Sequence, residues 1–160
     1  MSFNRILALV PTIALVAACA SQPAATPVSV ADTIARDPEL STLNSLVVKA
    51  GLADTLKAQG PYTVFAPTNE AFKAVPAKTM DDLAKDPAKL KAVLTYHVVP
   101  SQLTSSQVKT QNVKSAQGAN LALSKAGDFV TVEDAMVTHA DVMATNGVVH
   151  SVDRVLMPPR

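Results

Sequence analysis

The amino-acid sequence predicts an α+β fold in which helices and strands are segregated along the chain. Of the 160 residues, 48% are hydrophobic and 17% are charged, which suits one compact domain with a sizeable core. The first half shows apolar residues at helical spacing, whereas the second half shows short β-type segments between turn residues. Helices followed by strands favour an α+β arrangement over a doubly wound parallel sheet.

Residues 1–18 have the features of a secretory signal peptide. Arg5 precedes an uncharged stretch, Ile6 to Ala18, that is shorter than the roughly 20 residues a membrane-spanning helix needs. The stretch ends in LVAACAS, which resembles a bacterial lipobox, where the chain is cut before the cysteine and lipid is attached to Cys19. Ala20 after the cysteine favours the outer membrane in a cell that has one. The alternative is an ordinary signal-peptidase site with an incidental free thiol.

Residues 19–27 are predicted to be a lipidated flexible tether, because small residues and two prolines there lack any apolar period. The folded domain is predicted over residues 28–159. Cys19 is the only cysteine, so no disulfide can form within the chain. Removal of Arg5 with the signal leaves 14 − 1 = 13 basic side chains against 13 acidic ones. This balance gives no electrostatic basis for binding nucleic acid.

Helix signals dominate from residue 37 to residue 94. Asp37 is placed to cap a helix that Pro38 begins and Gly51 ends, and a short helix is predicted over residues 52–58. Thr79, with an acidic residue three positions later, suggests a capping box. The Asp86-Pro87 pair predicts the start of a further helix, through residue 94.

The segment YTVFAPTNEAF changes from strand to helix at its centre. Val64 and Phe65 are predicted to be buried in a strand that Pro67 ends. Thr68 or Asn69 is placed to cap the helix that follows, whose apolar face would include Phe72.

The second half reads as antiparallel strands. Asn146-Gly147, flanked by apolar residues, is typical of a two-residue type I′ hairpin, because both residue types tolerate positive φ. The predicted strand segments are YHVV, NVKS, NLALS, FVTVED, MVTHADVM and GVVHSVDRVL.

No residue pattern supports catalysis, a metal or a cofactor. His139 and Asp141 could share one face of a strand, but no third ligand accompanies them. His150, Ser151 and Asp153 contain the residue types of a catalytic triad, yet His150 and Ser151 alternate to opposite faces of a strand. Aromatic residues make up 4% of the chain, which disfavours a stacking platform for glycans or single strands.

Three motifs, in order and spacing, resemble the fasciclin (FAS1) domain: TVFAPTNEAF, LTYHVVP and ATNGVVHSVDRVLMPP. The resemblance covers residues 28–159. It implies a β-sandwich or wedge of about seven strands with several helices, mostly from the N-terminal half, packed on it. It also implies surface adhesion without catalysis or a required cofactor. The motif residues that we expect to be structural are Thr63, Phe65, Pro67, Thr68, Asn69, Phe72, Asn146, Gly147 and His150.

The resemblance also suggests candidate partner-binding residues. Tyr96-His97 and Asp141-Val142 stand where animal members of the family carry elements associated with integrin binding. His139 and Ala140 depart from the acidic residue and proline of the animal element, so integrin itself is not expected. The alternative is structural: Tyr96 or His97 could be a hydrogen-bonded core residue, Asp141-Val142 could close a strand, and His150 could be a core histidine.

We therefore expect a non-enzymatic adhesion or interaction module, held to the bacterial envelope by a lipid on Cys19. Its expected partners are surface proteins or glycans, the membrane through the lipid, and weakly a second copy of the chain, but no nucleic acid. The alternative is an envelope carrier or sensor that holds a small ligand in a cleft between the helices and the sheet.

Overall fold

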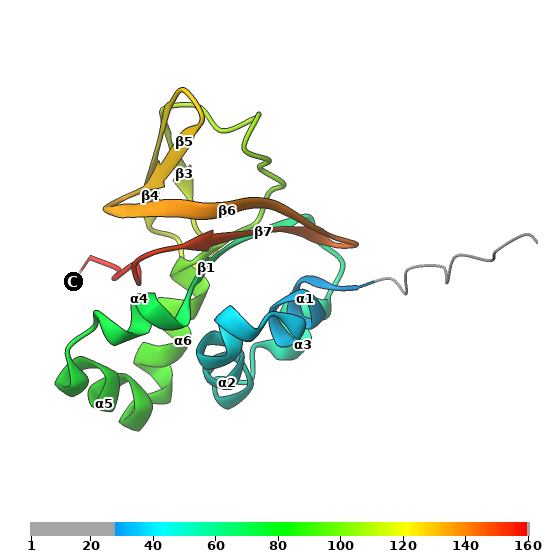
Figure 1. The fold of residues 1–160 in the computed structure, drawn as a ribbon. Helices are drawn as coiled ribbons and strands as arrows, with labels where there is room; N and C mark the ends of the chain where they lie inside the picture. The colour runs from blue at the N-terminus through cyan, green and yellow to red at the C-terminus, as the bar shows by residue number, and fades with distance from the viewer. Residues whose placement is uncertain (1–27, 160) are drawn as a thin grey trace, which may run out of the picture.

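The computed structural model describes residues 28–159, which contain helices from the first half of the chain and a sheet formed mostly by the second half (Figure 1). The helical elements are α1 (Val30–Arg36), the 3₁₀ turn η1 (Pro38–Leu40), α2 (Ser41–Lys49), α3 (Ala53–Lys57), α4 (Asn69–Lys73), α5 (Ala77–Lys85) and α6 (Pro87–Tyr96). The strands are β1 (Tyr62–Pro67), β2 (Val98–Val99), β3 (Gln111–Lys114), β4 (Asn120–Ala126), β5 (Phe129–Val132), β6 (Ala135–Ala144) and β7 (Gly147–Val152). The predicted signal peptide and tether lie outside the described residues.

The strands form one seven-stranded sheet in the order β2-β1-β7-β6-β5-β4-β3. β1 and β7 pair in parallel, and the other neighbours pair antiparallel. Figure 1 shows β3, β4 and β5 folded back above β6 and β7, with the helices below. The predicted α+β fold class is confirmed. The seven strands form one continuous, wedge-shaped sheet, because β5 pairs with the start of β6.

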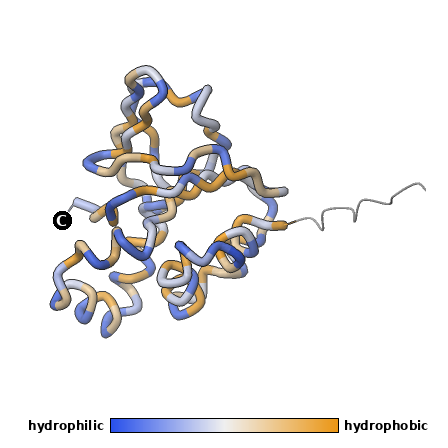
Figure 2. Tube along the Cα trace, in the orientation of Figure 1, coloured by the Kyte–Doolittle hydropathy of each residue, from blue (hydrophilic) through white to orange (hydrophobic). Residues whose placement is uncertain are grey.

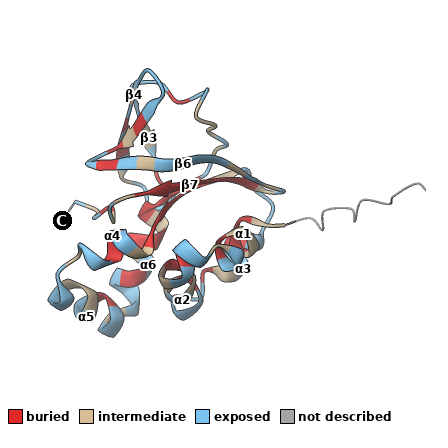
Figure 3. Ribbon diagram, in the orientation of Figure 1, coloured by how far each residue is buried: buried red, intermediate tan, exposed pale blue. Residues whose placement is uncertain are grey.

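Two apolar cores lie on the two sides of β1 and β7. Val64 and Val149 belong to the core under the helices, whereas Phe65 and Val152 belong to the core inside the wedge. Every residue of β7 is buried, as the continuous red strand in Figure 3 shows. Figure 2 shows the matching hydrophobic colour along the centre of the molecule. A strand buried on both faces reads as an apolar run rather than an alternating one.

The predicted signals at residues 37 and 51 are found at the ends of helices. The Asp37 carboxylate accepts a hydrogen bond from the backbone N–H of Glu39 at 2.9 Å, and Pro38 follows as the first residue of η1. Gly51 adopts φ +68°, the left-handed conformation that ends helices without a steric penalty. The sequence reading missed helix α1, whose cap is Ser29.

The predicted capping box at Thr79 is wrong. Thr79 lies inside α5, which begins after Pro76. The backbone N–H groups of Thr79 and Met80 both donate to the Pro76 carbonyl, at 2.9 and 3.2 Å. Pro76 is therefore the N-cap residue, and no side chain caps this helix.

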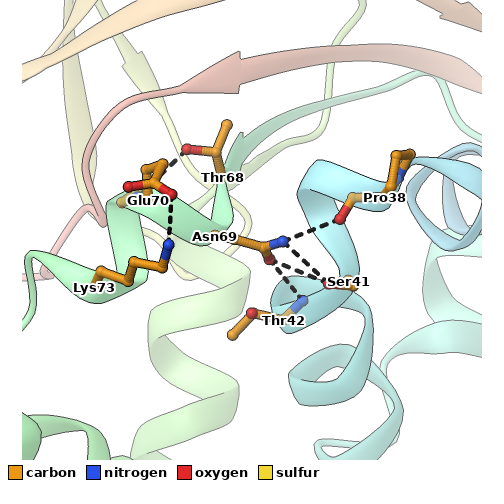
Figure 4. Close-up of polar contacts among 8 residues, drawn as sticks. Pro38, Ser41, Thr42, Thr68, Asn69, Glu70 and Lys73 are labelled. Atoms are coloured by element: carbon orange, nitrogen blue, oxygen red, sulfur yellow. Dashed lines mark hydrogen bonds and ion pairs between the residues drawn. The ribbon is translucent and has the colours of Figure 1, made fainter.

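The corner between β1 and α4 confirms the predicted change from strand to helix. Thr68 is the cap, since its hydroxyl accepts from the Ala71 N–H at 3.3 Å. Asn69 is not the cap, and its side chain instead forms hydrogen bonds with the junction of η1 and α2 (Figure 4). Its amide donates to the Pro38 carbonyl and accepts from the Thr42 N–H, both at 3.0 Å. The corner therefore fixes α4 and also ties it to the η1–α2 junction.

The predicted type I′ turn at Asn146-Gly147 is wrong. Ala144 pairs with Gly147, so the two loop residues are Thr145 and Asn146, and neither has positive φ. Gly147 is required for another reason. A Cβ placed on it would lie 1.9 Å from the Tyr62 carbonyl oxygen. Glycine therefore permits the close approach of β7 to β1.

Asn146 holds the start of the domain to the end of the β6–β7 hairpin. Its amide donates to the carbonyls of Leu56 and Ala58 at 2.7 and 2.8 Å. Its Oδ1 accepts from the Val30 N–H at 2.8 Å. One side chain thus joins α1, the end of α3 and the hairpin, which accounts for an asparagine at this turn.

Candidate interaction surface

Tyr96 and His97 lie inside the protein, at the junction of α6 and β2. Tyr96 is 3% exposed and His97 is 2% exposed. The Tyr96 hydroxyl donates to the Asn120 carbonyl at 3.3 Å and lies 3.5 Å from the Glu133 carboxylate. Burial, and the negative charge of Glu133, raise the pKa of Tyr96. Both residues are therefore hydrogen-bonded core residues, and neither ring is exposed for contact with a partner.

His97 connects α6 to the segment that follows β7. Its Nδ1 donates to the Val93 carbonyl at 2.7 Å, and its Nε2 accepts from the Leu156 N–H at 3.0 Å. This pairing is satisfied only by the neutral ring that carries its proton on Nδ1. Burial lowers the pKa of His97 from 6.5 to about 4.

Asp141 and Val142 lie in the middle of β6, so they do not close a strand. The β6–β7 register shifts between His139 and Val142, where Asp141 adopts φ +59°. This bulge disrupts the simple alternation that would place His139 and Asp141 on one face. Asp141 is exposed and Val142 is partly buried against the core under the helices.

The Asp141 carboxylate holds Ser105, which lies in the long connection between β2 and β3. It accepts from the Ser105 N–H at 2.7 Å and from the Ser105 hydroxyl. Partial burial acts to raise the pKa of Asp141, but the hydrogen bonds from Ser105 outweigh it, and the pKa is lowered. The ionised carboxylate is therefore the form that holds the connection.

His150 lies next to this bulge and is buried. Its Nδ1 accepts from the Asp141 N–H at 3.1 Å and its Nε2 donates to the Leu103 carbonyl at 2.6 Å. The ring stacks on Phe65 with a centroid separation of 5.6 Å. Burial lowers the pKa of His150. Both ring nitrogens bond to backbone, so His150 has no nitrogen left to activate Ser151.

Residues 101–105 are thus held from several strands, and we call them the strap. The Thr63 hydroxyl donates to the Ser101 carbonyl at 2.6 Å and accepts from the Leu103 N–H at 2.8 Å. Lys125 donates to the Ser105 carbonyl at 2.7 Å. The sequence did not predict Ser105 or Lys125 as part of this site, because neither a polar loop residue nor a single strand lysine carries a periodic signal, and their contacts are far away in the sequence.

The described part of the chain contains a small inner cavity and a large open groove. The cavity, of about 50 Å³, lies between the helices and the sheet, and its surface is almost entirely apolar. A much larger open groove, of about 1110 Å³, is formed by α4, α5, α6 and the segment after β7. Sites for drug-sized ligands measure roughly 300 to 1,000 Å³, so the inner cavity is too small for the predicted carrier cleft.

Within residues 28–159, no helix is both long and apolar enough to cross a bilayer. The same residues contain no group of three or more histidine, cysteine or carboxylate side chains placed to hold a metal ion.

The family model described as the fasciclin domain matches residues 38–158. A protein from Synechocystis, sll1483, is 44% identical over 148 residues, which cover 91% of this chain and 81% of that protein. The cell surface glycolipoprotein MPB83 of Mycobacterium bovis is 41% identical, over 81% of this chain and 60% of MPB83. The pig transforming growth factor-beta-induced protein ig-h3 is 42% identical over 82% of this chain, which spans 19% of ig-h3.

The fold is also found among solved structures. A FAS1 domain pair from the insect cell adhesion molecule fasciclin I superposes with a TM-score of 0.63 at 23% identity, covering 76% of this chain and 46% of that chain. This similarity concerns the fold. The match over residues 38–158 and the relatives at more than 40% identity show that the chain belongs to the fasciclin domain family.

Proposed function

We propose that this chain is a non-enzymatic interaction module of the bacterial envelope, held to the membrane by lipid on Cys19 and binding a partner through the surface of its fasciclin domain. Fasciclin domains occur in cell adhesion and cell-surface proteins, among them fasciclin I and MPB83. The lipobox-like segment before Cys19 supports the lipid anchor. Several acyl chains on one residue would give stable attachment, since a single chain binds only marginally.

One observation supports this function best: the polar side chains that were candidates for catalysis form hydrogen bonds that hold the fold together. His97 and His150 each use both ring nitrogens on main-chain atoms. The Asp141 carboxylate binds the main chain and hydroxyl of Ser105. Catalytic groups need to converge on a site where a substrate atom can sit. These groups stiffen a scaffold, which suits a domain that presents a surface.

The lipid anchor is tested by metabolic labelling with palmitate. We expect label on the wild-type chain and none on a Cys19→Ser variant, because the thiol is the acceptor. Equal label on the variant would show that lipid is attached elsewhere, or not through a lipobox.

Adhesion is tested by deleting the gene and scoring cell aggregation and attachment to surfaces. We expect at least one of the two to fall, and to recover when the wild-type gene is returned. If neither changes under any growth condition, the interaction role is wrong.

A further inference from the structure

The large groove is the surface that best fits a partner. Its floor is aliphatic and includes buried Ala71, Leu83 and Val93. One wall is the segment after β7, with Val155 and Met157, the latter 43% exposed. No aromatic ring is among the described residues that line it. Sugar-binding clefts usually stack a ring on the sugar, so this groove fits aliphatic side chains better than a glycan.

The charged groups at the groove are unevenly matched. Lys89, Arg154 and Asp82 supply two cations and one carboxylate. Lys89 forms an ion pair with Asp86, with 3.5 Å between Nζ and Oδ2. Arg154 is exposed and pairs with none of the described carboxylates. A guanidinium next to an aliphatic floor is suited to a carboxylate on a partner, which it can bind with two parallel hydrogen bonds.

The groove also lies away from the point where the tether joins the domain. The Val28 carbonyl accepts from the Thr145 N–H at 2.9 Å, so the described chain begins beside the β6–β7 turn. Figure 1 shows α5 and the C-terminal segment at the opposite end of the molecule from this point. In a domain anchored through the residues before Val28, the groove lies at the end remote from the attachment point.

We propose that this groove binds an aliphatic peptide segment of a partner protein, with a carboxylate of that segment paired to Arg154. The statement that the groove is remote from the anchor rests on the lipid attachment of the proposed function, whereas the peptide specificity does not. The proposal selects protein over glycan as the partner and places the contact on α4, α5, α6 and the segment after β7.

The test is selection from a phage library of random 12-residue peptides on the full chain carrying Cys19→Ser, with a glycan array probed in parallel. We expect the selected peptides to combine aliphatic residues with Asp or Glu, and to bind more weakly as salt rises, because an exposed charge pair is screened.

Variants then locate the binding site. Arg154→Glu should weaken the selected peptides at least tenfold, since it places like charges together, and Ala74→Gln should do the same by filling the groove. Both positions are exposed, so folding should be retained. The matched controls, Lys114→Glu on β3 and Phe129→Ala on β5, are exposed on strands outside the groove and should leave affinity unchanged.

Three results would overturn the proposal: no peptide selected, selected peptides that tolerate both groove variants, or glycan binding that the groove variants abolish. Any of these would leave the deletion phenotype standing. Conversely, a deletion strain that aggregates and attaches normally, or a wild-type chain without palmitate label, would not affect peptide binding in the groove. Failures of the two proposals can therefore be told apart.

Discussion

His97 makes the stability of this domain depend on pH in a way the structure defines. The ring is 2% exposed and its Nε2 accepts the Leu156 N–H. Protonation would place a hydrogen on that nitrogen, remove its hydrogen bond with Leu156, and leave a buried charge with no facing carboxylate among its hydrogen-bond partners. Lowering the pH should therefore destabilise the folded state, which contains the neutral His97 ring.

The magnitude follows from the pKa. Burial lowers the pKa of His97 to about 4, whereas the unfolded chain keeps the ordinary 6.5. Between these values the unfolded state binds more protons, so the contribution is complete above pH 6.5 and is lost as pH falls toward 4. At about 1.4 kcal/mol for each pH unit, the whole difference amounts to about 3 kcal/mol.

The assay is urea denaturation of wild type and His97→Gln at about pH 8 and about pH 4.5. Glutamine places an amide oxygen where Nε2 lies and does not titrate. Between these two pH values, wild type should lose about 2.5 kcal/mol more unfolding free energy than the variant. Comparing the two proteins cancels the contributions of His150 and the carboxylates.

Equal losses in the two proteins would refute this account of His97. The control is His139→Gln, because His139 is exposed on β6. That variant should lose as much unfolding free energy as wild type over the same pH range.

Four further predictions concern backbone and side-chain contacts, each checked by urea denaturation. Gly147→Ala should cost at least about 3 kcal/mol, because a Cβ there meets the neighbouring strand, while Gly127→Ala, at φ +61° in open space, should cost about 1 kcal/mol. Asn146→Ala should cost about 2 to 4 kcal/mol, because three backbone groups lose their partner. Thr68→Ala should cost roughly 0.5 to 2 kcal/mol through loss of the helix cap, without loss of partner binding. Asp141→Ala should cost about 1 to 3 kcal/mol and speed amide hydrogen exchange in the strap.

Each of these predictions has a contradicting result. Equal costs for the two glycine variants would mean that β1 and β7 do not need their close approach at residue 147. A neutral Asn146→Ala would mean that water replaces the amide contacts. Partner binding lost by fully folded Thr68→Ala would make the corner a contact surface. Unchanged exchange in Asp141→Ala would mean that the other contacts suffice to hold the strap.

Local signals predicted the local structure well. The cap at Asp37, the glycine stop at Gly51 and the change of structure at Pro67 each depend on a few adjacent residues, and all are found. The errors came where a neighbour distant in sequence decides. Thr79 fits a capping box by type, but Pro76 had already started the helix. Asn146-Gly147 fits a hairpin turn, yet Gly147 is there because of Tyr62 on another strand.

The site shows the same division more strongly. The two motifs that contain Tyr96-His97 and His150 were identifiable, but only the three-dimensional structure shows that these side chains bond to backbone groups. The bulge at Asp141 and its contact with Ser105, 36 residues earlier, have no sequence signature. The groove joins residues 71–93 to residues 154–159, which periodicity in either segment cannot predict.

The most direct test of the central claim is attachment of the gene-deletion strain to a surface after it receives either the wild-type gene or the Cys19→Ser variant, at matched protein levels. The account predicts that wild type restores attachment and that the variant, folded and exported but without lipid, does not. Full restoration by Cys19→Ser would contradict an interaction module that acts from a lipid anchor on the envelope.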